Sequence, residues 1–215
     1  MSSETRAVNT EVSEEGIIRY PLAEEFYTLQ GEGFHTGKAA AFVRLGGCGN
    51  GCPWCDTKEA QTTDNCRWLT AGEIAETVVN EGAQTAIITG GEPLQWRLDA
   101  LTEALHRHNI RVFLETSGTR PSSGEFDWVC LSPKPFAPPV EELFAKADEL
   151  KVVITGDEDL RYAEECAQKV GDKCLLYLQP EWSRRGEIIP KVVEYIKGHP
   201  EWQLSLQTHK FIDIP

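Results

Sequence analysis

The sequence predicts an α/β fold, a reduced or partial (β/α) barrel of about six parallel strands with its active site at the carboxyl-terminal rim of the strands. From residue 85 onward, short β-branched runs alternate with helical patterns, which is typical of a parallel sheet covered by helices. The 215 residues are too few for a complete barrel, which takes about 250 residues. Polar and glycine-rich groups directly follow several of these runs, where parallel folds bind ligands.

The expected strands are short apolar runs, and the expected helices have apolar residues spaced three or four apart. The first strand, Ala39–Leu45, lies just before a group of cysteines, and a capping box formed by Thr70 and Glu73 opens a helix over residues 71–81. Further strands are predicted at 85–89, 111–115, 150–154, 174–178, 202–206 and Trp128–Leu131. Further helices are predicted from the apolar faces Leu98, Leu101, Leu105 and His108, then Leu160, Ala163, Ala167 and Val170, and, after a turn at Ile189-Pro190, Val192, Val193 and Ile196.

The composition is that of a globular protein. With 40% hydrophobic residues the chain can form a sizeable core, and its net charge of -13 argues against a broad nucleic-acid or anionic-membrane surface. No run approaches the roughly 18 apolar residues of a membrane span. We expect residues 1–16 to be a disordered or loosely ordered tail without a signal-peptide core, and residues 17–215 to form a single domain. The seven cysteines suit the cytoplasm, where thiols stay reduced.

Cys48, Cys52 and Cys55 form a tight group of thiols, separated by three and then two residues. This spacing indicates a metal or iron–sulfur site rather than a disulfide framework. A zinc ribbon or a closed 4Fe–4S cluster needs four protein ligands, so three thiolates leave one iron open to a substrate or cofactor. Cys66 is an alternative fourth ligand, and it would make the chain a non-catalytic metal-binding module.

Five polar groups follow predicted strands and are expected to meet at one rim of the sheet. Each group on its own is an ordinary loop, but their shared position favours a ligand site. The groups are Thr89-Gly90-Gly91-Glu92-Pro93, Glu115-Thr116-Ser117-Gly118, Ser132-Pro133-Lys134, Gln179-Pro180-Glu181 and Gln207-Thr208-His209-Lys210.

Most candidate residues have both a functional and a structural interpretation. Gly91 lets backbone groups approach a ligand, although most glycine-rich turns are structural. The pair Asp56-Thr57 suits a hard cation such as Mg²⁺, and it also suits a helix cap. Trp54 could pack on a cofactor or anchor its loop.

Residues around the first strand suit a small polar molecule. Gln30 and Glu32 can read amide and amine groups, and Arg44 can hold a carboxylate in a bidentate contact. His209 could bind the same molecule, although a lone histidine is more often structural.

These motifs together resemble a known family. The cysteine spacing with Trp54 before the third cysteine, and the sequence Thr-Gly-Gly-Glu-Pro at 89–93, resemble the radical S-adenosylmethionine (SAM) superfamily. The sequences Phe-Tyr-Thr-Leu-Gln-Gly-Glu-Gly at 26–33, Phe-Val-Arg-Leu at 42–45 and Cys-Asp-Thr at 55–57 resemble the 7-carboxy-7-deazaguanine synthases of 7-deazapurine biosynthesis. The resemblance covers nearly the whole chain from Tyr20 onward.

The resemblance implies a radical SAM carbon–nitrogen lyase that converts 6-carboxy-5,6,7,8-tetrahydropterin to 7-carboxy-7-deazaguanine and releases ammonia. The three cysteines would hold a 4Fe–4S cluster, Thr57 would bind Mg²⁺, and no residue is expected to act as a general acid or base. Cofactor binding is expected at Trp54, Asp56, Gly91, Glu92, Ser117, Ser132, Pro133, Lys134 and Gln179. Substrate binding is expected at Leu29, Gln30, Gly31, Glu32, Arg44, Thr89, His209 and Pro215, the last through a terminal carboxylate.

The resemblance also implies partners and leaves one enzymatic alternative. A flavodoxin- or ferredoxin-type donor would reduce the cluster, and we expect it to dock on a local basic patch including Lys38, Lys58 and Arg67. A homodimer is expected, and no nucleic-acid or membrane partner. The alternative is a radical SAM activase that acts on a partner protein.

Overall fold

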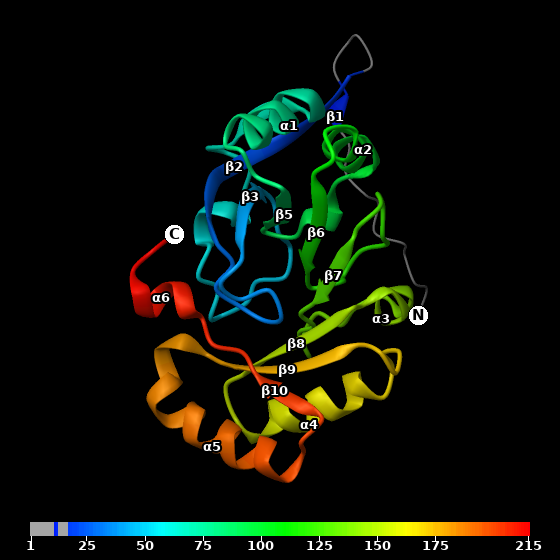
Figure 1. The fold of residues 1–215 in the computed structure, drawn as a ribbon. Coiled ribbons are helices and arrows are strands. Elements are labelled where there is room, and N and C mark those ends of the chain that lie inside the picture. Colours follow the sequence, from blue (N-terminus) through cyan, green and yellow to red (C-terminus); the bar gives the residue numbers. More distant parts are fainter. Residues whose placement is uncertain (1–10, 13–16) are drawn as a thin grey trace.

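A computed structural model of the protein describes residues 11–12 and 17–215. Figure 1 shows one curved sheet with helices along its outer face. The strands are β1 (Glu11–Val12), β2 (Ile18–Leu29), β3 (Ala39–Leu45), β4 (Arg67–Thr70), β5 (Thr85–Gly90), β6 (Arg111–Thr116), β7 (Trp128–Leu131), β8 (Glu149–Ile154), β9 (Leu175–Pro180) and β10 (Trp202–Leu204). The α-helices are α1 (Ala71–Asn80), α2 (Asp99–Arg107), α3 (Glu141–Lys146), α4 (Asp157–Ala167), α5 (Arg185–Gly198) and α6 (Thr208–Ile212), and the short 3-10 helices are η1 (Lys58–Gln61), η2 (Pro93–Gln95) and η3 (Trp182–Arg184).

The sheet has the topology of an open barrel. Strands β3, β5, β6, β7, β8, β9 and β10 are neighbours in this order, and all of these pairings are parallel. β2 pairs antiparallel with β3 at one side, and it also pairs with β1 and β4. The predicted partial (β/α) barrel is therefore confirmed, with an added antiparallel edge.

The predicted parallel strands agree with the structure to within about two residues at their ends, but β2 was not predicted. β2 contains Pro21, which cannot donate a ladder hydrogen bond, and its register shifts between Leu22 and Glu24. These irregularities hide the alternation of apolar and polar residues that normally marks a strand. The predicted N-terminal tail lies outside the described residues, except for the two that form β1.

The predicted capping box on α1 is confirmed. Thr70 Oγ1 accepts from the Glu73 amide at 3.2 Å, and the Glu73 carboxylate accepts from the Thr70 amide at 2.7 Å. Two helix predictions were wrong in detail. His108 follows α2 and is exposed. α5 begins at Arg185 and runs through Pro190, which is tolerated because this residue faces solvent and water can reach the carbonyl it leaves unpaired.

The main apolar core lies between the sheet and the helices rather than inside the barrel. On β6, Val112 and Leu114 point into this core, whereas Phe113 belongs to a small separate cluster with Ala40 and Ile87. On β8, the alternate positions Glu149 and Lys151 are charged and buried. The concave side of the sheet is therefore lined largely by polar groups, and the apolar helix-facing side supplies the packing.

No helix among residues 11–12 and 17–215 combines the length and apolarity that a bilayer crossing requires.

The capping box gives a stability prediction. Thr70→Ala removes the acceptor for the Glu73 amide at the start of α1, so the free energy of unfolding should fall by about 1 kcal/mol in denaturant titrations. Thr77→Ala is the matched control, because the Thr77 hydroxyl only bonds to the Glu73 carbonyl within the same helix. An equal loss in both variants would contradict a specific role for the cap.

Candidate active site

One cavity of about 1070 Å³ lies at the carboxyl ends of the parallel strands. It brings together nearly all the residues that the sequence singled out. The predicted residues that line it are Leu29, Gln30, Gly31, Glu32, Arg44, Cys48, Cys52, Trp54, Cys55, Asp56, Thr57, Thr89, Gly91, Ser117, Ser132, Lys134, Gln179, His209 and Pro215. Two predicted residues, Glu92 and Pro133, do not line it.

Backbone hydrogen bonds hold the cysteine loop against the end of β5. The Glu92 amide donates to the Gly47 carbonyl at 2.9 Å, and the Gly47 amide donates to the Ala60 carbonyl at 2.8 Å. A Cβ on Gly91 would lie 2.4 Å from the Gly47 oxygen and 2.8 Å from Cys48 Cβ. Only glycine at position 91 leaves room for this loop, so the glycine pair and the cysteine loop form one structural unit.

The three cysteine thiols are free and line the cavity together. Burial raises the pKa of Cys48 and Cys52 in the metal-free chain, so metal binding has to displace protons from these thiols. Among the described residues, no group of three or more Cys, His, Asp or Glu side chains is arranged to hold a single metal ion. Three soft sulfur donors facing a large cavity instead fit a cluster with one open iron.

Cys66 lies apart from the other three thiols. It does not line the cavity, and its Sγ contacts the Thr62 carbonyl oxygen at 3.7 Å. A Cβ on Gly46 would lie 2.3 Å from this sulfur, so Cys66 packs beneath the loop rather than at its open face. This position disfavours Cys66 as a fourth cluster ligand.

The Glu92 carboxylate is buried and already occupied by protein donors. Its Oε1 accepts from the Leu94 amide at 3.1 Å and from Thr116 Oγ1 at 2.6 Å, and its Oε2 accepts from the Ser117 amide at 2.9 Å and from the Ser117 hydroxyl. Glu92 thus joins the end of β5 to the end of β6. Its side chain positions Ser117 at the cavity wall.

The cysteine loop also contacts the next two strand ends. Asn50 Nδ2 donates to Ser117 Oγ at 2.7 Å. Lys134, which follows β7, donates to the Ser132 carbonyl at 2.6 Å and to the Ser132 hydroxyl at 2.7 Å. Trp54 packs edge-to-face on Phe136, with ring centroids 5.5 Å apart. These contacts give the cysteine side of the cavity a fixed wall of hydroxyl, amide and ammonium groups.

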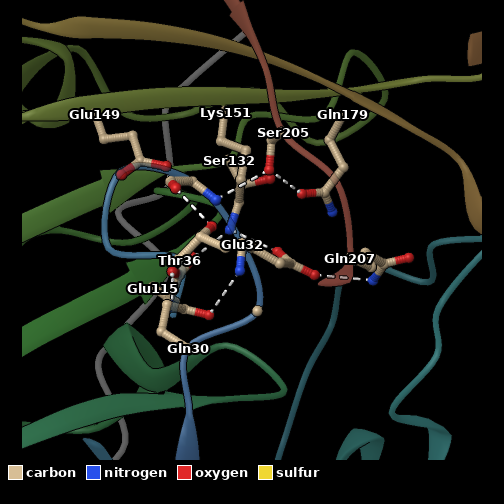
Figure 2. Close-up of polar contacts among 12 residues, drawn as sticks. Gln30, Glu32, Thr36, Glu115, Ser132, Glu149, Lys151, Gln179, Ser205 and Gln207 are labelled. Carbon is tan, nitrogen blue, oxygen red and sulfur yellow. Dashed lines mark hydrogen bonds and ion pairs between the residues drawn. The ribbon is translucent and has the colours of Figure 1, made fainter. Parts of the chain in front are cut away.

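A buried ammonium organises the opposite side of the cavity. Figure 2 shows Lys151 of β8 between two carboxylates, with Nζ 2.7 Å from Glu32 and 2.9 Å from Glu115. Gln30 Nε2 donates to the other Glu115 oxygen at 3.1 Å. Burial alone would raise the pKa of Glu32, but the charge and hydrogen bonds of Lys151, with a hydrogen bond from Gln207, hold it at about 2. Glu32 is therefore ionised at neutral pH.

The C-terminal segment links this network to the cysteine loop. Gln207 Nε2 donates to Glu32 Oε1 at 2.8 Å and to Asp56 Oδ2 at 3.1 Å. Lys210 donates to the same Asp56 oxygen at 2.6 Å. Asp56 is thus held by protein groups, whereas Thr57 occupies the cap position of η1 without making a capping hydrogen bond. The Thr57 hydroxyl lies 3.7 Å from Cys55 Sγ and faces the cavity.

The loop between β2 and β3, residues 30–38, packs against the starts of the barrel strands. Phe34 stacks on Trp128 with ring centroids 5.1 Å apart, and His35 stacks on Phe113 at 4.5 Å. The Phe34 amide donates to the buried Glu149 carboxylate at 3.2 Å. Gly33 has φ 63°, and a Cβ there would lie 1.8 Å from Glu149 Oε1, so only glycine allows this approach.

The remaining predicted substrate residues lie along the walls. Arg44 bonds to Glu24 at 2.8 Å and lies over the Phe26 ring, which stacks on Phe42. A Cβ on Gly31 would lie 2.0 Å from His209 Nδ1, so these two residues are in close contact. The wall therefore combines an aromatic shelf with one guanidinium.

Sequence reasoning missed some polar residues of the site. Lys151 lies within an apolar strand, and Gln207 was noted only as part of a rim group. The buried charge in the run Glu-Leu-Lys-Val-Val-Ile was the available signal for Lys151, because an unpaired lysine is almost never buried. None of the three residues of the predicted basic patch, Lys38, Lys58 and Arg67, lines the cavity, and Lys38 lies over the Phe34 ring and 3.1 Å from His35 Nδ1. The patch stays a prediction.

Comparisons with known proteins agree with this geometry. A sequence profile of the radical SAM superfamily matches residues 42–131. A 7-carboxy-7-deazaguanine synthase of Flavobacterium psychrophilum is 48% identical over 195 residues, which cover 91% of this chain and 92% of the relative. A second 7-carboxy-7-deazaguanine synthase, from Synechocystis sp., is 44% identical, and the match covers 94% of this chain and 97% of the relative. The crystal structure of QueE from Escherichia coli has a TM-score of 0.79 at 29% identity, covering 89% of this chain and 95% of that one.

Replacing the buried lysine should destabilise the fold strongly. Lys151→Met leaves the carboxylates of Glu32 and Glu115, whose side chains are 19% and 20% exposed, without a cation, so the free energy of unfolding at pH 7 should fall by up to about 3–5 kcal/mol. The loss should shrink at low pH, where the two acids can protonate. Lys210→Met is the control, because its pair with Asp56 is partly exposed and worth about 1 kcal/mol or less. Equal losses would contradict the central role of Lys151.

Glu149 gives a pH-dependent stability prediction. Burial raises its pKa from 4.5 to about 7, so folding takes up a proton between these pH values and the stability that Glu149 contributes falls as pH rises through them. Glu149→Gln keeps an acceptor for the Phe34 amide without this titration. The free energy of unfolding of the variant minus that of the wild type should rise by on the order of 2 kcal/mol from pH 5 to pH 8, as measured by denaturant unfolding. A stability difference that stays constant over this pH range would refute the raised pKa of Glu149. Glu187→Gln, at an exposed position, serves as the control.

Proposed function

Because the chain belongs to the family of 7-carboxy-7-deazaguanine synthases, within the radical SAM superfamily, we propose that it converts 6-carboxy-5,6,7,8-tetrahydropterin to 7-carboxy-7-deazaguanine with loss of ammonia. This reaction belongs to 7-deazapurine and queuosine biosynthesis. The observation that carries the proposal is a single cavity with a thiol loop on one side and a charged hydrogen-bonding network on the other.

Cys48, Cys52 and Cys55 would hold the 4Fe–4S cluster, whose open iron takes SAM. When bound, the two cofactors would supply the radical chemistry needed to activate a carbon–hydrogen bond of the substrate. The chain's own contribution is to orient the groups and to exclude water. Because the Glu92 carboxylate is saturated by protein donors, the Gly91 backbone would meet the amino group of SAM, and Glu92 would act by positioning Ser117. Further SAM contacts would come from Trp54, Asp56, Ser132, Pro133, Lys134 and Gln179.

Substrate recognition would rest on the network around Lys151. Gln30 and Glu32 present amide and carboxylate groups that can read the amide and amine edge of a pterin. Arg44 and the aromatic shelf beside it suit a carboxylate and a flat ring. Leu29, Gly31, Thr89, His209 and Pro215 would complete the pocket.

Thr57 would bind Mg²⁺ together with the substrate carboxylate. Its hydroxyl is a hard oxygen donor that faces the cavity and makes no capping bond. Mg²⁺ often takes only one or two protein ligands and completes its shell with substrate oxygens and water. The ion would fix the carboxylate beside the carbon that loses hydrogen.

We further propose a cytoplasmic homodimer that receives electrons from a flavodoxin or ferredoxin. A radical SAM activase is the rival function, and it would require a partner protein for turnover. The polar network around Lys151 favours a small heterocycle over a polypeptide.

Anaerobic incubation of the reconstituted protein tests the proposal directly. With SAM, Mg²⁺, a reductant and the pterin, the wild type should form 7-carboxy-7-deazaguanine and ammonia, detected by mass spectrometry. Thr57→Ala should lower the rate and weaken the dependence on Mg²⁺. Cleavage of SAM without any deazaguanine product would refute the substrate assignment.

The cysteine variants separate a radical enzyme from a metal-binding module. Cys52→Ala should lose most of the bound iron and sulfide after reconstitution, because it removes one of three ligands. Cys66→Ala should keep wild-type iron content, since its sulfur lies beneath the loop. Iron loss in Cys66→Ala, or zinc in place of iron in wild type, would instead support the module.

A further inference from the structure

A second, very small cavity lies behind the wall of the proposed substrate site. Its volume is about 10 Å³, which is close to the space that one water molecule needs. Gln30, Glu32 and Glu115 line both this cavity and the large one, so they form the wall between the two. His35 and Glu149 line only the small cavity.

Two buried polar atoms beside the small cavity have no hydrogen-bond partner. They are His35 Nε2 and Glu149 Oε1, and both residues are at least nine-tenths buried. An unsatisfied buried polar atom costs about 1–3 kcal/mol, so native proteins usually pair such atoms with protein or ordered water. A single water in the cavity would satisfy both atoms at once.

The contacts of the two residues define where their protons lie. Lys38 Nζ, an obligate donor when charged, lies 3.1 Å from His35 Nδ1, so the neutral ring carries its proton on Nε2. Glu149 Oε2 accepts from the Phe34 amide and from Trp128 Nε1, both at 3.2 Å, which leaves Oε1 for a proton. Both unpartnered atoms therefore act as donors toward the cavity.

The electrostatic surroundings agree with these protonation states. Burial, together with the charges of Lys38 and Arg111, lowers the pKa of His35 to about 4, so the ring is neutral. Burial raises the pKa of Glu149 to about 7. The titratable groups that face Glu149 are Lys151 on its own strand, Glu115 on β6, Cys130 on β7, and Cys174 and Tyr177 at β9.

We propose that one buried water, held by His35, joins Glu149 to Glu115 as a proton relay into the substrate cavity. The proposal rests on the ammonia-releasing reaction, in which the leaving amine needs a proton to depart as ammonium. Glu115 lines both cavities, so it connects the buried water to the substrate and to the solvent of the large cavity.

The transfers balance without any change of oxidation state. The O–H bond of Glu149 breaks as the water takes its proton, and the water passes one of its own protons to Glu115, which gives it to the leaving amine. His35 keeps its Nε2 proton and holds the water by donating to it. After the ammonium leaves, Glu149 regains a proton from solvent in the open large cavity along the same path, through Glu115 and the water. The net result is one proton moved from solvent to ammonia, which leaves as ammonium.

Variants that keep the packing test the relay by its pH dependence. Glu149→Gln removes the titrating proton, and His35→Phe keeps a ring that can stack on Phe113 and meet Trp128 edge-to-face. Glu164→Gln is the control, because Glu164 also accepts from two aromatic side chains, half-buried Tyr195 and buried Trp202, but lies outside both cavities. Thermal unfolding measurements check that each variant is folded. If Glu149→Gln does not fold, His35→Phe alone tests the relay.

The expected outcome is a loss of product without a loss of SAM cleavage. Wild-type product formation should decline as pH rises through about 7, as the Glu149 pKa requires. Both relay variants should form product about tenfold or more slowly per 5′-deoxyadenosine released, and Glu149→Gln should lack the decline near pH 7. Wild-type rates and pH profiles in both variants would overturn the relay.

An infrared measurement tests the relay without cofactors or turnover. The wild type should show protonated carboxyl absorption that titrates near pH 7 and shifts in D₂O. Burial also raises the pKa of Glu25 to about 7, so the band of Glu149 is the component that is lost in Glu149→Gln and kept in Glu164→Gln. A high-resolution crystal structure should show one water between His35 and Glu149. Absence of the band, or a dry cavity, would refute the relay even if the deazaguanine reaction is confirmed. Absence of product in the wild type would refute the proposed reaction, and with it the delivery of a proton to ammonia, even if the band and the water are present.

Discussion

The buried ammonium of Lys151 is the constraint on which the concave side of the barrel depends. Glu32 comes from the loop after β2 and Glu115 from the end of β6, and neither could be buried as an anion without a cation between them. Their attraction to Lys151 draws the β2–β3 loop into the barrel. Gly33 and His35 are thereby brought against Glu149 and Phe113, so one ion triad determines where the loop lies.

The two sides of the sheet differ in composition and in their contribution to stability. The helix-facing side is apolar and carries the stability of the domain, with residues such as Ile88, Leu114 and Val152 almost fully buried. The concave side holds few apolar residues and many hydrogen-bonded polar ones. This division lets the cavity keep charged groups in defined positions, because the fold does not depend on apolar packing there.

Much of the fold and the site was predictable because the relevant signals are local. The cysteine spacing, the glycine pair at 90–91 and the capping box of Thr70 each lie within a few residues, and all appear in the structure where they were expected. The missed features depend on contacts between distant residues. Lys151 meets Glu32 across 119 positions and Gln207 meets Asp56 across 151, and no local pattern records such pairs. The strand β2 was missed because Pro21 and a register shift interrupt its alternation.

The amide of Gln207 bonds to both Asp56 and Glu32, and this shared contact has a consequence for how such proteins can be recombined. Asp56 directly follows the third cysteine, so the Gln207 side chain ties the cysteine loop to the C-terminal segment and to the network around Lys151. A chimera that exchanged the cysteine loop alone would inherit a mismatched C-terminal segment. Functional transplantation between members of this architecture therefore has to move both segments as a pair, although Asp56 and Gln207 lie 151 positions apart in the chain.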